Sequence, residues 1–592
     1  MPSCKIVRIT GLDLTGKKCL NFPSIKKRIQ DLLSDKKSDF LIPDYQRPYA
    51  WTEDECDTLW DDLFGFCFPN NDFEAFDTSS EYFLGPIVTF KNENHKQEII
   101  DGQQRLTTIL LLLRAFYDKF QMMEDKQSKS IREKISHCVW KCNEFDEPDM
   151  SQLKIDSQVA SDNDKDEFLN ILRTGTVSPN WKSNYAKNFR FFQAKIKELV
   201  NTYPPFTTYF AARILQNVIL LPIEAESQDT ALRIFSTLND RGLPLSDADI
   251  FKSKFYSFYS KLGKKNEFIK RWKQLELLTE EIFSSSRSAP MVELFTRYMY
   301  YARAKLGVKD TTTPALRLFF EGGNNYKALS DESVFNELES LANFWKRLYR
   351  PDEFSDKTKK QLFILQYAPN GMWTYLTSVY FLARKDKNDN LDEKAFNQFL
   401  DKITAFIIAY AVMRPGVNAL RTPVYPEMVN LVTGLDVKFE NHKFSKDVID
   451  NTLKSFSFTN GRPVTRSILT WWAMQNPDQI VLDKFTSFDI EHIYPSRRMR
   501  ESPLKNSNNF ESLGKKSILE KRINIRASDY RFEDKIRYYL GKLEKREPTK
   551  IEDLKHLAES LKDFTEVDIE NRTQQIINSF ISYLDQNSLI SH

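Results

Sequence analysis

The sequence has few cysteines and few histidines for its length, six of each in 592 residues. The cysteines are scattered, so a disulfide framework of the kind found in small secreted domains is not expected. His137, Cys138 and Cys142 lie close together and could in principle hold zinc, but no second ligand pair follows them. The spacing of these three residues favours one face of a helix instead.

Long apolar runs are also missing. The stretch "TTILLLLRAF" (107–116) is interrupted by Arg114 and is shorter than the roughly 20 residues that cross a membrane. The opening residues, "MPSCKIVRIT", lack the charged-then-apolar layout of a signal peptide. We therefore expect a cytoplasmic protein with no membrane partner.

The chain has little net charge, +3, which by itself indicates no polyanionic partner. The charge is unevenly distributed. Residues 497–550 contain 16 Lys and Arg against 8 Asp and Glu, so the remainder of the chain is net acidic. A basic run is usually a solvated face, so this segment alone is only weak support for nucleic-acid binding.

The pattern of apolar residues predicts an α+β, mostly helical protein of several domains, because a chain of this length exceeds one core. Short strand-like runs and helices mix in the first part, helical spacing dominates the middle, and strands return near the end. These shifts predict an N-terminal domain (1–265), a helical body (266–480) and a C-terminal domain (481–592) that ends in a helix.

The stretch "DIEHIYPS" (489–496) carries the clearest chemistry. Alternation places Asp489 and Glu491 on one face of a short strand, and His492 follows at a turn that Pro495 favours. A carboxylate can hold a divalent cation while a neighbouring imidazole takes a proton from water, which is the minimum for metal-assisted hydrolysis. The alternative is a histidine whose hydrogen bonds are satisfied locally at a strand end.

The downstream stretch "LGKKSILEKRINIRASDYRFEDKIRYY" (513–539) favours the hydrolytic interpretation. It predicts a turn, a second strand and a basic helix, and Asn524 would return a side-chain oxygen toward the first strand. Two strands followed by a helix, with a metal ion between them, make the ββα-metal arrangement.

Three motifs occur in the first half of the chain: "LIPDYQRPYAW" (41–51), "IIDGQQRLTTI" (99–109) and "IFSTLNDRGLPLSDADIFK" (234–252). In the second motif a strand is predicted to end at Asp101 and a helix to begin near Gln103, which would create an anion site at a helix N-terminus. The alternative is an ordinary turn with polar caps.

Each of the other two motifs also has both a functional and a purely structural interpretation. In the third, Ser246 and Asp249 are predicted to cap the following helix, and the loop before it has side chains suited to a phosphate, a base or the turn itself. That loop supplies Asn239, Asp240 and Arg241. The first motif interleaves aromatic residues with Gln46 and Arg47, a composition suited to stacking and phosphate contact, or to a core.

Together these motifs resemble the GmrSD-type family of modification-dependent (type IV) restriction enzymes. The resemblance implies an N-terminal ParB/sulfiredoxin-like domain with a "DGQQR" motif, and a C-terminal HNH nuclease domain that is also similar to the HNH domain of CRISPR effector nucleases. It covers about residues 20–260 and 480–580. The matching motifs are long, whereas the helical body between them is less distinctive.

By this resemblance, His492 would be the general base, Glu491 and Asn524 the metal ligands, and Asp489 their support. The nucleoside triphosphate (NTP) pocket would be formed by Asp101, Gly102, Gln103, Gln104, Arg105, Asn239, Arg241 and Asp249. In members of the family that sense phosphorothioate DNA, residues of the "YQR" type contact the modified backbone, which here implies Tyr45, Gln46 and Arg47.

One position departs from the family pattern. Lys515 follows Gly514 where the family usually has an asparagine that fixes the loop carrying the histidine, and a lysine cannot accept a hydrogen bond. Because Lys515 stands at this position in the predicted nuclease motif, we include it among the candidate catalytic residues. Asn508 or Asn509 would be the substitute for the missing amide.

The expected function is a prokaryotic, cytoplasmic anti-phage defence endonuclease that senses modified DNA and hydrolyses an NTP. Its expected cofactors are Mg²⁺ or Mn²⁺ and GTP or ATP, and its expected partner is double-stranded DNA from phage or carrying phosphorothioate. A homodimer is compatible with the sequence. Two alternatives are an NTP-gated DNA-binding regulator with a weakened HNH domain and an RNA-cleaving toxin.

Overall fold

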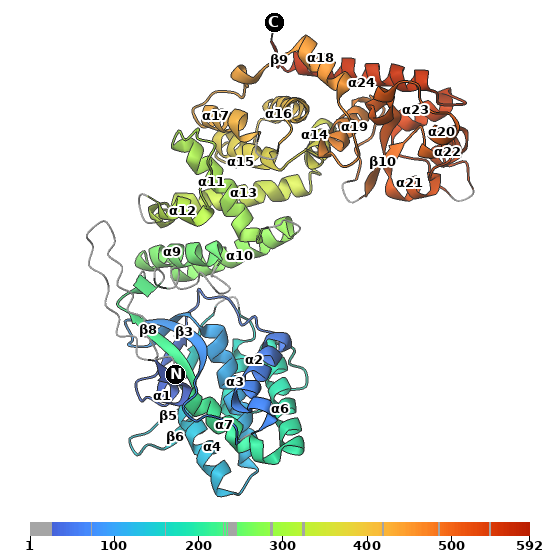
Figure 1. The fold of residues 1–592 in the computed structure, drawn as a ribbon. Helices are drawn as coiled ribbons and strands as arrows, with labels where there is room; N and C mark the ends of the chain where they lie inside the picture. Colours follow the sequence, from blue (N-terminus) through green and yellow to red (C-terminus); the bar gives the residue numbers. More distant parts are fainter. Residues whose placement is uncertain are drawn as a thin grey trace, which may run out of the picture. The chain divides into compact units, whose positions relative to one another are not determined.

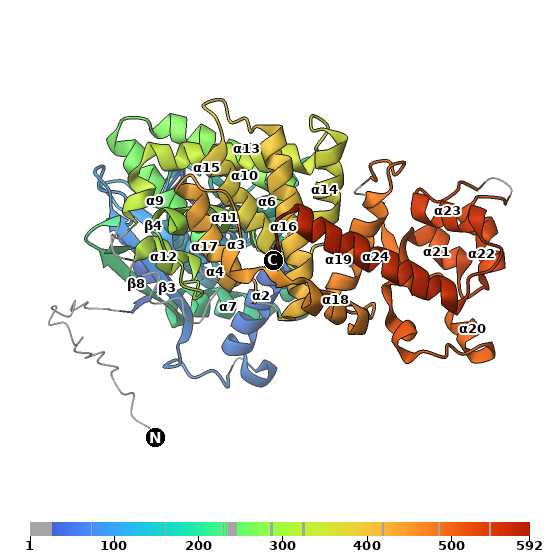
Figure 2. The same ribbon diagram turned by 90° about the horizontal axis from the view of Figure 1, so that it is seen from above.

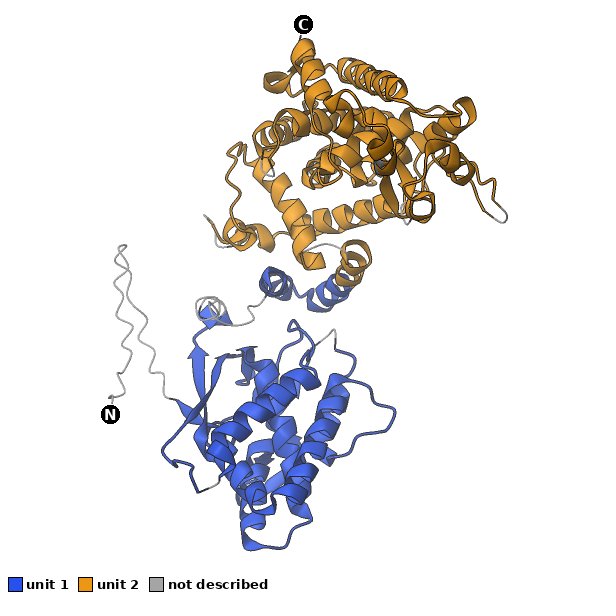
Figure 3. Ribbon diagram, turned by 45° about the vertical axis from the view of Figure 1, so that its right-hand side comes forward, with its two compact units in different colours: residues 1–273 blue, residues 274–592 orange. Residues whose placement is uncertain are grey.

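The computed structural model divides into two compact units, residues 1–273 and 274–592, and the division falls within one helix (Figure 3). The expected three-part division, with a boundary near residue 480, stays a prediction. The described residues are 26–72, 74–159, 162–228, 230–231, 234, 246–284, 288–322, 326–416, 419–483, 486–543 and 546–591.

The first unit is built on a mixed six-stranded sheet with the strand order β1-β8-β3-β4-β2-β7. The long central strands β3 and β8 run parallel, β4 is antiparallel to β3, and β2 is parallel to both of its neighbours. The bounds are β1 Lys27–Arg28, β2 Phe40–Ile42, β3 Tyr82–Lys91, β4 Gln97–Asp101, β7 Ile155–Ser157 and β8 Val218–Ala225.

Helix α3 (Gln103–Gln121) is the centre of this unit, and most of its side chains are buried. It packs against the helices α4, α5 and α6, while α1 and α7 contact the strands at one edge of the sheet (Figure 1). Arg114, the charge that interrupts the apolar run, is 3% exposed. Its guanidinium pairs with Asp118 one turn further along and donates to the carbonyl of Leu172 at 2.9 Å, so the buried charge is satisfied.

The remaining elements of the first unit surround α3 and the sheet. Their bounds are α1 Ile29–Leu33, α2 Glu53–Cys67, α4 Lys126–Val139, β5 Trp140–Cys142, β6 Pro148–Leu153, α5 Lys165–Thr174, α6 Asn184–Thr202, α7 Pro204–Asn217, α9 Asp247–Lys261 and α10 Lys265–Phe283, which continues into the second unit.

The second unit is largely helical over its described residues. Its helices between residues 290 and 475 are α11 Pro290–Lys305, α12 Leu316–Glu321, α13 Glu332–Tyr349, α14 Asp356–Gln366, α15 Met372–Arg384, α16 Glu393–Met413, α17 Arg421–Val432, α18 Lys446–Ser455 and α19 Pro463–Gln475. The short strands β9 Phe444–Ser445 and β12 Ile590–Ser591 pair with each other.

Near the C-terminus, β10 (Phe488–His492) and β11 (Lys516–Glu520) form an antiparallel hairpin, followed by α21 (Lys521–Ala527) and α22 (Phe532–Tyr539). The neighbouring helices are α20 (Ser496–Glu501) and α23 (Glu552–Ser560). The long helix α24 (Glu566–Gln586) packs against α16 and α18 and reaches the turn before β11 (Figure 2).

The prediction of an α+β, mostly helical protein is confirmed. Within the described residues, none of the helices combines the length and the apolar character that a membrane crossing requires.

Candidate functional site

The "DGQQR" motif forms a strand-to-helix turn, as predicted. Strand β4 ends at Asp101, and Gly102 precedes α3 with φ 93° and ψ 2°. A side chain at this glycine would lie 3.0 Å from the Ile87 Cγ1 atom and 3.1 Å from the carbonyl oxygen of Pro86. Both the left-handed backbone and this close approach require glycine.

The two glutamines join this turn to the segment of the first motif. Gln104 Oε1 accepts from the Ala50 amide at 2.8 Å, and its Nε2 donates to the Pro48 carbonyl at 3.2 Å. Gln103 Nε2 donates to the Arg47 carbonyl at 3.2 Å. Gln103 Oε1 is buried without a hydrogen-bond partner among the described residues. The structure therefore brings residues 41–51 and 99–109 together.

Charged groups gather at the same turn. Arg105 Nη2 lies 3.1 Å from Asp101 Oδ2, and these two side chains are 22% and 20% exposed. Burial raises the pKa of the Asp101 carboxyl, and the nearby guanidiniums of Arg105 and Arg47 oppose that rise. Two cations at the start of a helix make a positive site in which an anionic group would be stabilised.

The side chains of Tyr45 and Gln46 are packed inside the first unit. Each is 5% exposed. Gln46 Nε2 donates to the Ile100 carbonyl at 3.1 Å, and the Tyr45 ring lies 5.0 Å from the ring of Tyr256 on α9. Of the three predicted DNA-sensing residues, only Arg47 is half-exposed. Their sensing role stays a prediction.

The third motif is described only in part. Asn239, Asp240 and Arg241 lie outside the described residues. The predicted cap of α9 is confirmed: Asp249 Oδ2 accepts from the Ser246 hydroxyl at 2.9 Å, and the Asp249 amide donates back to that hydroxyl at 3.2 Å. The Asp249 carboxylate therefore stabilises the start of the helix.

The "DIEHIYPS" motif forms strand β10, and its partner β11 comes from the predicted second strand. His492 lies opposite Lys516 and Glu491 opposite Ser517. Helix α21, which carries Asn524, packs against both strands (Figure 1). The predicted order of strand, strand and helix is confirmed, while its identity as an HNH domain stays a prediction.

One residue of the turn before β11 and one residue of α24 explain how the hairpin is held. A side chain at Gly514 would overlap the carbonyl oxygen of Ile569 and the hydroxyl of Thr573 on α24, so this close packing requires glycine. Arg572, also on α24 and 4% exposed, donates to the carbonyls of Leu513, Gly514 and Lys516 at 2.7 to 3.2 Å. Sequence reasoning missed Arg572, which sits about 60 residues downstream without a motif.

Lys515 fixes the loop by donating hydrogen bonds. It is 3% exposed, and its Nζ lies 3.1 Å from both the Phe510 carbonyl and the Met499 sulfur. Its backbone carbonyl accepts from the Ile493 amide at 2.9 Å, directly after His492. Burial lowers the pKa of the Lys515 ammonium. In this conformation Lys515 braces the loop from within and is covered from solvent.

Asn509, predicted as one substitute for the family asparagine, also braces this loop. Its Nδ2 donates to Glu566 and to Glu570, both on α24, at 2.9 Å each. Asn508 instead donates its backbone amide to the side chain of Asn506 at 3.0 Å. The loop between the two strands is therefore tied to α24 by Asn509 and to itself by Lys515.

His492 lies in a strongly positive environment. Lys516 is fully buried and donates to the Phe458 carbonyl and to Asn460 while pairing with Glu511. Burial, with the charges of Lys516 and then Lys515, lowers the pKa of His492 to about 4. The imidazole is therefore neutral at neutral pH, and its buried Nε2 has no hydrogen-bond partner among the described residues.

Glu491 is 2% exposed and belongs to a buried network that sequence reasoning missed. Its Oε1 accepts from Lys535 Nζ at 2.6 Å and from the Tyr539 hydroxyl. Burial raises the pKa of the Glu491 carboxyl, and Lys535 opposes that rise. The sequence held one clue to this network, because positions 535 and 539 are one helical turn apart and share one face of a helix.

The predicted metal ligands are suited to a hard cation by type. A carboxylate and an amide oxygen are the donors that Mg²⁺ or Mn²⁺ prefers. Both hydrogen bonds to Glu491 fall on the Oε1 atom, and Asn524 is half-buried on α21. Asp489, on the same face of β10 as Glu491, lies 3.9 Å from Arg466 and is 37% exposed.

A further group with metal-ligating side chains lies in the first unit. Ligand atoms of His137, Cys142 and Asp146 lie within 4.8 Å of one another. The helix-face prediction is wrong for Cys142, because α4 ends at Val139 and Cys142 lies on β5. Both ring nitrogens of His137 already face backbone carbonyls, and Asp146 pairs with Lys36 at 3.2 Å. These contacts tie a hairpin to α4.

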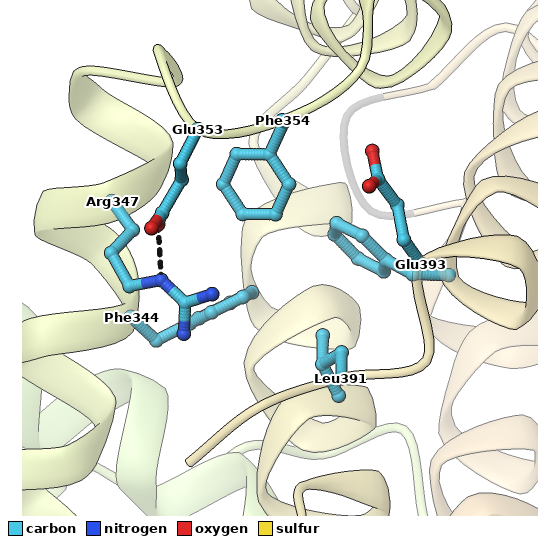
Figure 4. Close-up of a pocket in the computed structure, with 7 residues that line it drawn as sticks. Phe344, Arg347, Glu353, Phe354, Leu391 and Glu393 are labelled. Atoms are coloured by element: carbon cyan, nitrogen blue, oxygen red, sulfur yellow. Dashed lines mark hydrogen bonds and ion pairs between the residues drawn. The ribbon is translucent and has the colours of Figure 1, made fainter. Parts of the chain in front are cut away.

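One small cavity lies in the helical part of the second unit, away from the predicted site residues (Figure 4). Phe344, Phe354 and Leu391 supply apolar walls. Arg347 pairs with Glu353 there.

The family comparison agrees with the N-terminal motifs. Residues 29–256 match the family described as GmrSD restriction endonuclease, N-terminal domain. The matched segment, which is less than half of the chain, contains the sheet, α3 and the "DGQQR" turn. This part of the chain is therefore similar to the domain that begins GmrSD restriction endonucleases. No curated protein matches the chain.

Proposed function

We propose that this protein is an anti-phage defence endonuclease that senses modified DNA, binds and hydrolyses an NTP in its first unit, and nicks or cleaves DNA in an HNH domain near its C-terminus. The observation that carries the proposal is the environment of His492. A neutral imidazole, whose Nε2 has no hydrogen-bond partner among the residues that the structure describes, lies on a strand–strand–helix arrangement near the lysines at positions 515, 516 and 535.

This environment suits phosphodiester hydrolysis. Lys515, Lys516 and Lys535 are each at most 3% exposed, so their positive potential is only weakly screened by solvent. That potential attracts a phosphodiester and also keeps His492 unprotonated in the resting protein. His492 then takes a proton from the attacking water as a general base.

The metal ion of this proposal would be held by Glu491 and Asn524, with Asp489 in support. A bound Mg²⁺ or Mn²⁺ would polarise a phosphoryl oxygen and stabilise the charge that develops on it. The residues of the chain supply the rest: His492 holds the proton taken from water, and α24 keeps the loop after His492 in place through Arg572 and Asn509.

In the first unit, the proposed NTP site is the start of α3. Arg105, the backbone amides of the first helical turn and the Nε2 of Gln103 would hold the phosphates, and Asp101 would release Arg105 to the ligand. The buried Gln103 Oε1, which has no hydrogen-bond partner in the described part of the chain, supports a ligand with a hydrogen-bond donor, such as a ribose hydroxyl. GTP and ATP both satisfy this requirement.

Arg47 is the residue of the first motif best placed to contact a DNA backbone, because Tyr45 and Gln46 are buried. The environment of Lys515 favours an active nuclease over the regulatory alternative. A lysine that replaces the family asparagine still ties the loop, through the Phe510 carbonyl. The loop that follows the base therefore keeps its support.

The decisive experiment treats a panel of unmodified, phosphorothioate and glucosylated phage DNAs with the purified full-length chain. Each DNA is tested with Mg²⁺ or Mn²⁺, and with GTP, ATP or neither. We expect metal-dependent nicking of at least one modified DNA and a response to one nucleotide. Binding without cutting in every condition would support the regulator instead, and cleavage of cellular RNA alone would support the toxin.

A further inference from the structure

We infer that Lys535 is a positioning residue for His492. This inference rests on the proposed role of His492 as the base of a nuclease. Lys535 lies on α22, more than 40 residues after His492 in the chain, and it is 1% exposed. Its Nζ donates to the backbone carbonyl of His492 at 2.8 Å and to Glu491 Oε1 at 2.6 Å.

The chemistry of this contact suits lysine. An ammonium group has three donors and no acceptor, so one Nζ can bind acceptors from two consecutive residues at once. Here the acceptors are the side chain of Glu491 and the main chain of His492. Lys535 therefore contacts both of the last two residues of β10.

The contribution of the Glu491–Lys535 ion pair to stability does not by itself explain why the pair is present. An ion pair buried this deeply is expensive to desolvate, and apolar residues of similar volume often serve a fold equally well. The pair fixes the end of β10, where the strand stops and the proposed base must point at its target. An error of about 1 Å in the placement of a catalytic group can cost roughly a hundredfold in rate.

Tyr539 supplies a matched comparison within the same network. Its hydroxyl donates to the same Glu491 oxygen but makes no contact with the backbone of His492. Tyr539→Phe therefore removes a buried donor from Glu491 and leaves the carbonyl contact of Lys535 in place. A second comparison is Arg297 on α11, a buried cation paired with Glu293 and distant in sequence from the hairpin.

The experiment uses the full-length protein, without metal or DNA, with its six histidines isotopically labelled for NMR. The spectrum of His492→Ala identifies the His492 signal. In Lys535→Met we expect the imidazole signal of His492 to shift or broaden while the other five stay in place. In Tyr539→Phe and Arg297→Met we expect the His492 signal at its wild-type position.

A second variant, Lys535→Arg, keeps the test valid if Lys535→Met does not fold. Lys535→Met leaves a buried carboxylate without its cation, whereas Lys535→Arg keeps the positive charge. The planar fork of arginine cannot reproduce both lysine contacts, so we expect a folded protein whose His492 signal has moved. If Lys535→Met does not fold, Lys535→Arg decides alone. An unmoved His492 signal in the folded Lys535 variants, or an equal shift in Tyr539→Phe, would overturn the inference.

The cleavage assay adds a separate result. At saturating DNA we expect nicking by Lys535→Met to fall about a hundredfold. KM should change by less than about threefold, since Lys535 is too buried to contact DNA and is only one of three lysines whose potential attracts it. Nicking at the wild-type rate would also overturn the inference. If the wild-type protein cuts no nucleic acid, the proposed nuclease fails, but the NMR comparison still shows whether Lys535 positions His492.

Discussion

Each unit of the protein has a carboxylate at or next to the end of a strand that is paired to a cation, and the two pairs differ in burial. Asp101 and Arg105 lie 3.1 Å apart and are 20% and 22% exposed. Glu491 and Lys535 lie 2.6 Å apart and are 3% and 1% exposed. Only the second cation also binds the backbone of the neighbouring residue.

The difference determines what each pair can do. A partly exposed pair contributes little to stability, so Arg105 can leave Asp101 for a phosphate at small cost. Removing one partner of a fully buried pair costs about 3–5 kcal/mol, because the other charge is left unpaired. The first arrangement suits a site that exchanges partners, and the second suits a site that must not move.

The largest expected effect is on cutting by the second site. His492→Ala should reduce DNA cleavage by about 10²- to 10⁴-fold, because it removes the general base. NTP hydrolysis by the same preparation should be unchanged, since the "DGQQR" turn belongs to the other unit. Nicking of modified plasmid and phosphate release are measured in parallel. Cleavage at the wild-type rate would remove His492 from the mechanism.

The exchangeable pair gives the second prediction. Arg105→Ala removes a charge-assisted contact to the bound phosphates, so NTP hydrolysis should fall by about one to two orders of magnitude. Since a ligand acts on a distant site only through different affinities for two conformations, the same variant should change how NTP modulates cutting. An NTP titration of cleavage measures this. Identical titrations for variant and wild type would reduce "DGQQR" to an ordinary turn.

Sequence reasoning succeeded where the pattern is local. The turn at Gly102 and the cap at Ser246 follow from residues a few positions apart, and the second strand of the hairpin follows from its own local pattern. It failed where contacts join distant segments. Nothing local indicates that Arg572 holds the turn at Leu513, or that Tyr45 is covered by Tyr256. Tertiary packing alone decides such contacts.

A pair of glycines, one in each unit, sharpens the comparison in terms of stability. Gly514→Ala should destabilise the hairpin by about 1–3 kcal/mol, because its new methyl group meets backbone of α24 that cannot move aside. Gly102→Ala should cost about 1–2 kcal/mol, mainly for a left-handed backbone. Hydrogen exchange at β11 and at α3 separates the two effects. Equal protection of β11 in wild type and Gly514→Ala would contradict the first.

The two sites should also respond to acid in opposite directions. The pKa of His492 is about 4 in the folded protein, below its value of about 6.5 when unfolded. The unfolded state therefore takes up the proton first, and stability falls as pH drops from 6.5 toward 4. The pKa of Asp101 is raised, so its protonation adds stability as pH falls through that raised value.

Unfolding measured between pH 7 and 4 tests both signs. His492→Ala should lose less stability than wild type over this interval, because the group responsible is absent. Asp101→Asn should lose more, because the folded state no longer gains the proton of Asp101. Parallel curves for all three proteins would mean that neither group titrates differently on folding.

The smallest effect is expected at Lys515. Lys515→Asn removes a buried ammonium and introduces the amide that the predicted HNH domain leads us to expect at this position, so nicking should be preserved or raised by at most about threefold. The reason is that this buried position keeps a polar side chain: Lys515 donates to the Phe510 carbonyl, and the shorter asparagine amide both donates and accepts toward loop backbone within its reach. Lys515→Met is the matched control, since it fills the same space without a donor and leaves that carbonyl unpaired, at a cost of about 1–3 kcal/mol. Nicking rate and melting temperature are measured for both. If Lys515→Asn lost as much activity as Lys515→Met, the ammonium itself would be required, and Lys515 would have to reach the scissile phosphate in a conformation other than the present one.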